Sequence, residues 1–322
     1  MRVRGELWAV AAALCFIGLE LSVRTAAPYA PPALGAFVRI WPIFAFAWAG
    51  TLASADARAE LGLALAPAGR LLLLALAVDG VLNMYVANTL KIYALQKGGI
   101  VLTLTAVEVG NLFGTALLVR YWLAHRVSGP VWAGMFVIVL GTAVASWSQV
   151  FIPDWSGVLL ISLAAGLCFA LSVTCVGYVL RHGVGLWPAL SLSATVGLIV
   201  TTIVGVASGQ APTPASLGHI GPTGIAFLLL SGLAYAAALF FLTGALQRIS
   251  IVSANAISGA NGPAAAFVGA LVFGPSVTLM LAVGVALVAI GAVLVRTRHA
   301  QDELAATPPE RPRRTAAATG RW

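Results

Sequence analysis

Charged residues are scarce in this chain. Aspartate, glutamate, lysine and arginine together make up only 9% of its 322 residues, whereas hydrophobic residues make up 60%. The mean hydropathy is +0.98. Because a soluble globular domain carries about 25% charged residues, the composition excludes a water-soluble protein and predicts an integral membrane protein.

Cysteine and histidine are also rare, with three and four copies. Cys15, Cys168 and Cys175 all lie in apolar runs, so we expect neither a disulfide framework nor a metal site. The histidines are His125, His182, His219 and His299, and none lies clearly inside a long apolar run. Neither an H-E-x-x-H motif nor a nucleophile elbow occurs. The sequence therefore predicts neither an enzyme nor a bound cofactor.

The net charge of +8 comes from arginines at the chain ends and in short connections. This placement is typical of a membrane-topology signal, so no nucleic-acid partner is expected. The opening "MRVRGELWAVAAALCFIGLEL" has the basic start and apolar stretch of a secretory signal. It lacks a clean small-x-small cleavage site and is interrupted by Glu20, so we favour a retained first span over a cleaved signal.

Long apolar runs fill most of the sequence. A helix that crosses a bilayer needs roughly 20 mainly apolar residues, and short connections with turn-forming residues separate such runs here. The predicted spans are 7–25, 33–53, 71–91, 98–119, 130–150, 157–180, 186–207, 223–245, 249–273 and 277–295. We therefore expect an all-α, polytopic membrane protein of ten transmembrane helices.

Basic residues predict which side of the membrane each connection faces. With the N-terminus inside, fourteen of the eighteen basic residues fall on the inner side. The outer connections hold only Lys91 and Lys97, while Arg24 and Arg39 lie near or within spans. Because Lys- and Arg-rich connections are retained in the cytoplasm, we expect both termini there.

Three short patterns recur along the chain at a nearly constant spacing of 150 to 153 residues. They are "ALQKGGIV" at 94–101 with "ALQRISIV" at 245–252, "LCF" at 14–16 and again at 167–169, and the pair Gly134 and Gly141 with the pair Gly284 and Gly291. One match among such common residues would be a coincidence. Three ordered matches predict a duplicated unit.

The repeat predicts two halves of five spans each. Since five is an odd number, the second half must cross the membrane upside down relative to the first, as an inverted-topology repeat. We expect a first repeat at 1–150, a second at 151–296 and a disordered basic cytoplasmic tail at 297–322.

Two stretches resemble EamA-type members of the drug/metabolite transporter (DMT) superfamily. The first is "ALCFIGLELSVRTAAPYAPPALGAFVR", a hairpin with a proline turn and an arginine, Arg39, early in the second span. The second is "GALQRISIVSANAISGANGPAAAFVGALVFGPSVTLMLAVGVALVAIGAVLV", with Pro263 in the ninth span and spaced glycines in the tenth. The resemblance covers about residues 7–296.

The resemblance implies a secondary transporter that exports a small organic metabolite, such as an amino acid, by alternating access. It also implies a multi-pass protein of the bacterial inner membrane whose partners are a small-molecule substrate and the lipid bilayer. A monomer and a homodimer both remain open. The alternatives are a lipid or lipid-linked flippase of the same fold and a non-transporting membrane protein.

Three carboxylates lie inside predicted spans: Glu20, Asp79 and Glu108. Ionisable groups in hydrocarbon are costly, so each is a functional candidate. Asp79 and Glu108 should both lie near the membrane midplane, where they could be neighbours. Two interpretations stay open: a proton-coupling or cation-binding carboxylate, and a neutral carboxyl that serves packing through an interhelical hydrogen bond.

Polar side chains form stripes on three of the predicted spans. They are Thr105, Glu108, Asn111 and Thr115 on the fourth span, Asn255, Ser258 and Asn261 on the ninth, and Asp79 and Asn83 on the third. Tyr85 and Tyr235 lie nearer the interior of the third and eighth spans. Facing stripes would line a central, partly hydrated cavity that binds the substrate.

The first hairpin carries Glu20, Arg24 and Arg39, which predicts an ion-paired cluster. The cluster would either pin the hairpin or bind a substrate carboxylate through Arg39. Further along, Pro263 removes a backbone donor from the middle of the ninth span and predicts a hinge or break there.

Overall fold

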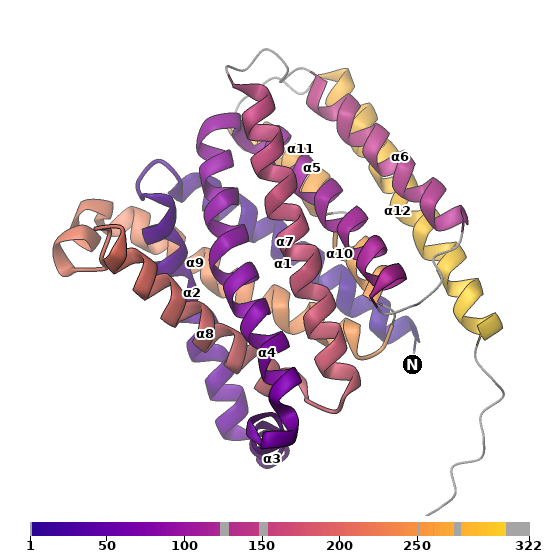
Figure 1. Ribbon diagram of the computed structural model, residues 1–322. Coiled ribbons are helices and arrows are strands. Elements are labelled where there is room, and N and C mark those ends of the chain that lie inside the picture. The colour runs from indigo at the N-terminus through magenta and orange to yellow at the C-terminus, as the bar shows by residue number, and fades with distance from the viewer. Residues whose placement is uncertain are drawn as a thin grey trace, which may run out of the picture.

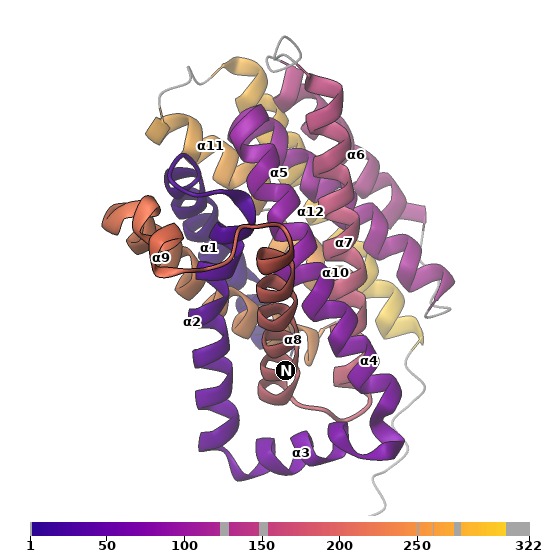
Figure 2. The same ribbon diagram turned by 60° about the vertical axis from the view of Figure 1, so that its left-hand side comes forward.

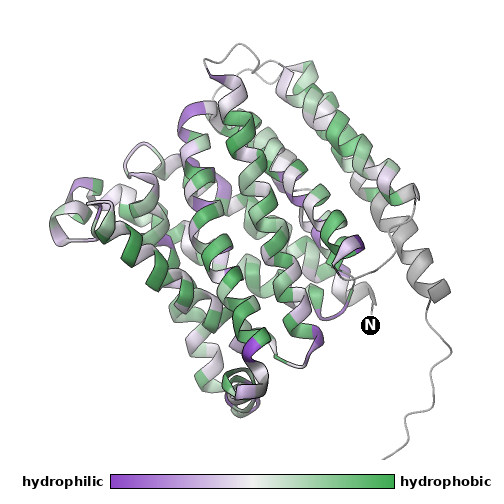
Figure 3. Ribbon diagram, viewed as in Figure 1, coloured by the Kyte–Doolittle hydropathy of each residue, from purple (hydrophilic) through white to green (hydrophobic). Residues whose placement is uncertain are grey.

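The chain is helical wherever its structure is described. The computed structural model describes residues 2–122, 129–147, 154–249, 251–259, 261–273 and 278–306, and none of these lies in a strand. Six helical segments are long and apolar enough to cross a membrane, and three shorter apolar helices accompany them. Hydrophobic residues predominate along most of the coloured helices (Figure 3). The predicted all-α membrane class is therefore confirmed at this level.

The helices follow the order of the apolar runs. Up to residue 122 they are α1 (Arg2–Ala26), α2 (Pro32–Ala53), α3 (Ala55–Leu65), the 3₁₀ turn η1 (Pro67–Gly69), α4 (Arg70–Asp79), the π-helical segment η2 (Gly80–Ala87) and α5 (Asn88–Tyr121). Beyond it they are α6 (Gly129–Ser146), α7 (Trp155–Arg181), α8 (Leu186–Ala207), α9 (Pro214–Leu246), α10 (Ile251–Gly259), α11 (Asn261–Phe273) and α12 (Leu279–Ala306).

Two long helices are broken by a glycine. Gly99 has φ 73° and ψ −179° inside α5, and Gly221 has φ 73° and ψ 164° inside α9. Side-chain-bearing residues rarely adopt this conformation, whereas glycine does so at little steric cost. Each glycine therefore divides its helix into two arms that point in different directions.

The helices pack in pairs that are distant in sequence: α1 with α9, α2 with α8, α5 with α7, and α6 with α12. In Figures 1 and 2, α6 and α12 lie side by side along one flank of the bundle. Small residues allow the close approaches, because a methyl group added at Gly110 of α5 would lie 3.1 Å from the Gly166 backbone of α7.

Large apolar side chains point outward as well as inward. Leu14, Phe136, Leu160 and Leu279 are each more than 60% exposed, while Leu19, Ile40 and Leu95 are fully or almost fully buried. An outward apolar face on most helices is what a lipid-facing bundle presents, since lipid tails replace water around it.

Three segments that were predicted to lie outside the spans contain helix. The helix α3 lies in the segment between the second and third predicted spans, and Figure 2 shows it running across one end of the bundle. The first turns of α9, capped by Thr213, lie in the predicted connection 208–222. Finally, α12 runs through 297–306, so the predicted disordered tail begins as helix, and 307–322 lie outside the described residues. Prediction by span length overlooked these pieces because each is too short to cross a bilayer.

Candidate functional site

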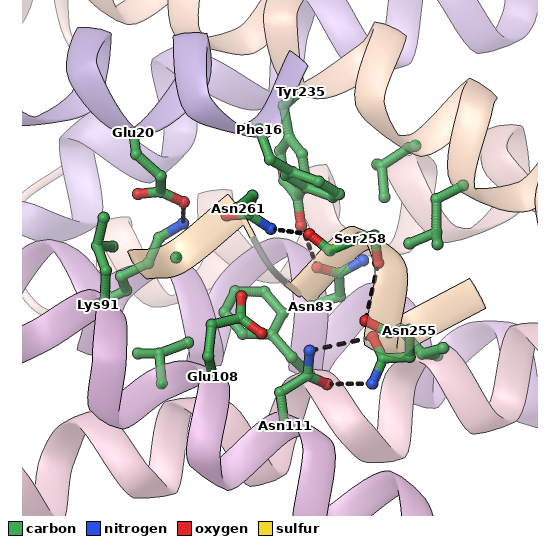
Figure 4. Close-up of a pocket in the computed structure, with 17 residues that line it drawn as sticks. Phe16, Glu20, Asn83, Lys91, Glu108, Asn111, Tyr235, Asn255, Ser258 and Asn261 are labelled. Carbon is green, nitrogen blue, oxygen red and sulfur yellow. Dashed lines mark hydrogen bonds and ion pairs between the residues drawn. The ribbon is translucent and has the colours of Figure 1, made fainter. Parts of the chain in front are cut away.

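A cavity of about 60 Å³ lies inside the helix bundle. Figure 4 shows side chains from α1, η2, α5, α7, α9, α10 and α11 around it. Its polar residues are Glu20, Asn83, Lys91, Glu108, Asn111, Tyr235, Asn255, Ser258 and Asn261. All except Lys91 were candidate residues in the sequence, so the structure brings most of the predicted polar residues together.

An ion pair forms one wall of this cavity. The Nζ of Lys91 donates to Oε1 of Glu20 over 2.6 Å and so connects α5 to α1. The two side chains are only 4% and 6% exposed. The Lys91 ammonium also lies 5.4 Å from the ring centroid of Phe169 on α7. Placement of Lys91 in an outer connection was therefore wrong: the helix continues through this residue, and Glu20 compensates its buried charge.

The predicted cluster of Glu20, Arg24 and Arg39 does not form. Glu20 pairs with Lys91, and Arg24 donates from Nη1 to the Leu95 carbonyl over 2.7 Å. That carbonyl lies near the end of the helical arm that precedes Gly99, where the last carbonyls lack partners within the helix. The sequence grouped these charges by their positions in one hairpin, whereas their actual partners lie on α5, 71 residues further along the chain in both cases.

Arg39 lies behind the cavity, next to Tyr235. Its Nη1 donates to Oδ1 of Asn88 over 3.1 Å, and its guanidinium carbon is 5.5 Å from the Tyr235 ring centroid. Arg39 is 2% exposed, and its Nε and Nη2 have no hydrogen-bond partner among the described residues. Tyr235 borders both the main cavity and the narrow space beside Arg39, so its ring separates the two.

A chain of hydrogen bonds passes through η2. Asn88 donates to the backbone carbonyl of Asn83, Tyr235 donates to the Asn83 side-chain oxygen, and Asn83 donates to Asp79 over 3.4 Å. Ser172 of α7 donates to the same Asp79 oxygen. Asn83 itself lies in the π-helical segment η2. Such π-helical segments are frequent at functional sites.

Glu108 is the carboxyl of the cavity that has no cation beside it in direct contact. It lies on α5 beyond the Gly99 break, is 8% exposed, and its Oε2 has no hydrogen-bond partner among the described residues. In Figure 4 its carboxyl group points into the cavity, across from the Glu20 and Lys91 pair. Gly262 of α11 leaves room for it, because a methyl group there would press against the Glu108 side chain.

Amide side chains join the two halves of the chain at the cavity. Asn111 on α5 and Asn255 on α10 exchange hydrogen bonds of 3.1 and 3.2 Å, and Asn255 also donates to Thr115 over 2.8 Å. Asn261 at the start of α11 donates to the Ser258 carbonyl of α10 over 2.6 Å. These contacts fix the amides around the Glu108 carboxyl.

Four residues of the predicted stripes and span interiors are not in the cavity lining: Asp79, Tyr85, Thr105 and Thr115. Asp79 is 1% exposed and bonded to Ser172 and Asn83, so it is not the direct neighbour of Glu108 that its depth suggested. Thr105 contacts Ser146 of α6 over 2.8 Å. Tyr85, on η2, is half-buried outside the cavity. For Pro263, α10 ends at Gly259 and α11 begins at Asn261, so the helices divide just before the predicted hinge.

Three important lining residues were missed: Lys91, Phe16 and Phe169. A signal for the phenylalanines existed, because each ends one copy of the repeated "LCF". The position of Lys91 carried no comparable signal, since its acidic partner lies 71 residues earlier in the chain.

Comparisons with known proteins bear on the fold alone. No family model matches the chain, and no curated protein matches it. One solved structure, titled "Crystal structure of protein", superposes with a TM-score of 0.67 at 15% sequence identity. The match covers 94% of this chain and 100% of the other. The helical arrangement is therefore found in another protein, and the site must be interpreted from its own residues.

Proposed function

We propose that this protein is a secondary carrier that exports a small organic solute across the membrane by alternating access. The observation that carries the proposal is the cavity, in which a carboxyl without a cation partner lies inside a bundle of long apolar helices. A buried charge in hydrocarbon is costly and marks a substrate or ion pathway by default. The resemblance to EamA-type transporters implies the same function.

Contacts between spaced glycines support an inverted repeat. Gly134 and Gly284 are 150 residues apart, as are Gly141 and Gly291. The close contacts join them crosswise: Gly141 lies against the backbone of Gly284, and Gly291 against that of Gly134. Two equivalent units related by a twofold axis make this pattern, in which residue i contacts j and residue j contacts i.

The cavity repeats this pattern. Asn111 bonds Asn255, and Gly262 lies against the Leu104 carbonyl. Each of these contacts exchanges for the other under a spacing of 151 residues. A substrate site on the axis between two inverted halves is the arrangement that alternating access requires.

The break at Gly99 supports the predicted number of ten membrane crossings. The apolar run Arg70–Tyr121 has 52 residues, which at about 1.5 Å per residue is far longer than a bilayer core of about 30 Å. The break at Gly99 divides this run into two helices of spanning length. The start of α1, the helix α3 and the end of α12 lie toward the same end of the bundle (Figures 1 and 2), which supports termini on one side.

Transport of a solute by purified protein tests the proposal. The protein would be reconstituted into sealed vesicles and screened against small metabolites, with and without a pH gradient. We expect saturable flux of at least one solute that empty vesicles do not show. An absence of saturable flux for every charge class of small solute, under both conditions, would contradict a carrier function.

A further inference from the structure

The charges that line the cavity do not cancel. Glu20 and Lys91 neutralise each other in direct contact, whereas no cation of the lining contacts Glu108 directly; each of the two acids keeps one carboxyl oxygen without a hydrogen-bond partner among the described residues. The lining therefore carries one acid more than it has bases. A ligand with a single positive charge would balance this extra acid.

The charged residues outside the lining do not change this balance. Arg39 and Asp79 are one cation and one anion, and both bond to asparagines that are themselves linked, Asn88 and Asn83. The Arg39 guanidinium lies beside the Tyr235 ring and outside the lining, and its charge acts on the lining only at a distance, chiefly on Glu20. The acid without a base in direct contact is consequently Glu108.

The rest of the lining suits an organic ammonium group. Phe16, Phe169 and Tyr235 present aromatic rings to the cavity, and Phe169 already lies beside the Lys91 ammonium. Aromatic faces attract cations, most strongly where water is excluded. A volume of about 60 Å³ has room for roughly four to six water-sized groups, which is the size of a short alkylamine.

We propose that the cavity binds a small organic amine as its ammonium ion, paired with Glu108, and that Lys91 sets the preference for a single charge. This inference rests on the proposed carrier function and names its substrate class. Lys91 is a cation of the protein itself, and it pairs with the second carboxylate of the cavity, Glu20. A ligand with two ammonium groups then finds only one free acid.

The wild-type protein allows a test that needs no variant. Binding of four probes of matched size would be measured by calorimetry on the full chain in lipid nanodiscs: propylamine, 1,3-diaminopropane, propionate and propionamide. At neutral pH propylamine is charged, like the lysine side chain. We expect propylamine to bind best and propionate not to bind. Equal binding of propionate or propionamide would overturn the proposal.

Variants then assign the charge to a residue. Glu108→Gln should weaken propylamine binding at least about tenfold, whereas Asp79→Asn, the matching acid-to-amide change at a residue outside the lining, should weaken it much less. Unchanged binding in Glu108→Gln, or an equal loss in both variants, would overturn the assignment. Size-exclusion profiles and thermal unfolding curves verify that each variant is folded.

Lys91 is tested by a change of preference. Lys91→Met should shift the ratio of affinities toward 1,3-diaminopropane, because it frees Glu20. Since this variant leaves an unpaired acid and can fail to fold, the charge-balanced Glu20→Gln/Lys91→Met variant is measured beside it. That variant should retain the preference for propylamine, and a preference for the diamine there would contradict the role of Lys91.

The outcomes separate the substrate class from the carrier function. Saturable vesicle flux of a neutral or anionic solute, without amine binding, would reject the amine and leave the carrier standing. Amine binding without flux across the vesicle membrane would reject the carrier function and leave the amine site standing.

Discussion

The Glu20 and Lys91 pair shows how one residue can make another tolerable in a membrane. Each side chain is almost fully buried, and Nζ and Oε1 are 2.6 Å apart. Desolvation of two such charges costs several kcal/mol per ion, and their attraction at close range offsets much of it. Neither charge would be stable at this depth without the other.

Removal of one partner should therefore destabilise the protein more than removal of both. We expect Lys91→Met to lower the free energy of unfolding by about 3–5 kcal/mol, and the Glu20→Gln/Lys91→Met variant to recover most of that loss. Unfolding of the purified protein in mixed micelles, titrated with a denaturing detergent, measures both. Similar losses in the single and double variants would show that the pair contributes little.

Glu108 is the residue through which a proton gradient would act in the proposed carrier, because it is the cavity acid without a cation in direct contact. An amide cannot take up or release a proton, so flux through Glu108→Gln at saturating solute should be the same with and without a pH gradient. Vesicle flux at two internal pH values measures this. Asp79→Asn is the matched control, and gradient dependence that survives in Glu108→Gln would assign coupling to another group.

At this scale the sequence predicted positions better than partners. The buried positions of Glu108, Asn111 and Asn255 could be predicted because polar residues stand out in apolar runs. The partner of Glu20 was not, because ion pairing between helices depends on how they pack. Lys91 was assigned to a connection for the same reason. In the sequence, a lysine at the end of a helix cannot be distinguished from a lysine that forms a buried ion pair.

Among the elements, α5 carries the largest share of the cavity. One arm holds Lys91 and the other holds Glu108 and Asn111, with Gly99 between them. The direction of each arm is thus set by a single residue in a conformation that requires glycine.

Substitution of Gly99 should destabilise the protein even though the added side chain would contact no other atom. A methyl group at Gly99 would meet no atom within 4 Å, so Gly99→Ala tests backbone conformation alone. We expect a loss of about 1–3 kcal/mol in unfolding free energy. Gly18→Ala in α1, which also has no atom within 4 Å of its added methyl group and lies in a regular helix, should be neutral or slightly stabilising. Equal stabilities for the two variants would show that the break tolerates other residues.

Element boundaries followed hydropathy wherever apolar runs were long. The span predicted at 186–207 coincides with α8, because glycine, histidine and polar turns bracket a uniform apolar run. The short α3 was missed, since eleven residues of mixed polarity leave no span-length signal. The π-helix η2 was also invisible in the sequence, because no residue pattern distinguishes an i→i+5 turn from an α-helical one.

For the whole molecule, the proposed inverted repeat makes a prediction about topology. It predicts that equivalent connections lie on opposite sides of the membrane. Lys97 and Gln247 are exposed residues in the two copies of the repeated pattern, 94–101 and 245–252.

Labelling of single cysteines tests this inversion. In a background without Cys15, Cys168 and Cys175, a membrane-impermeant maleimide should modify Lys97→Cys in intact cells. The same reagent should modify Gln247→Cys only after the membrane is opened. Modification of both in intact cells would contradict the inverted topology.

The ion pair also has a consequence for synthesis. Both of its members lie within the first 91 residues, so this charge compensation can be complete while the second half of the chain is still on the ribosome. The Asp79 carboxylate must wait for Ser172, which is 93 residues away, or on the order of 5 to 20 seconds at usual elongation rates. During that interval the growing chain holds an acid whose serine donor has not yet been synthesised. The efficiency of membrane insertion should therefore depend on how long the incomplete helix bundle is kept out of contact with lipid.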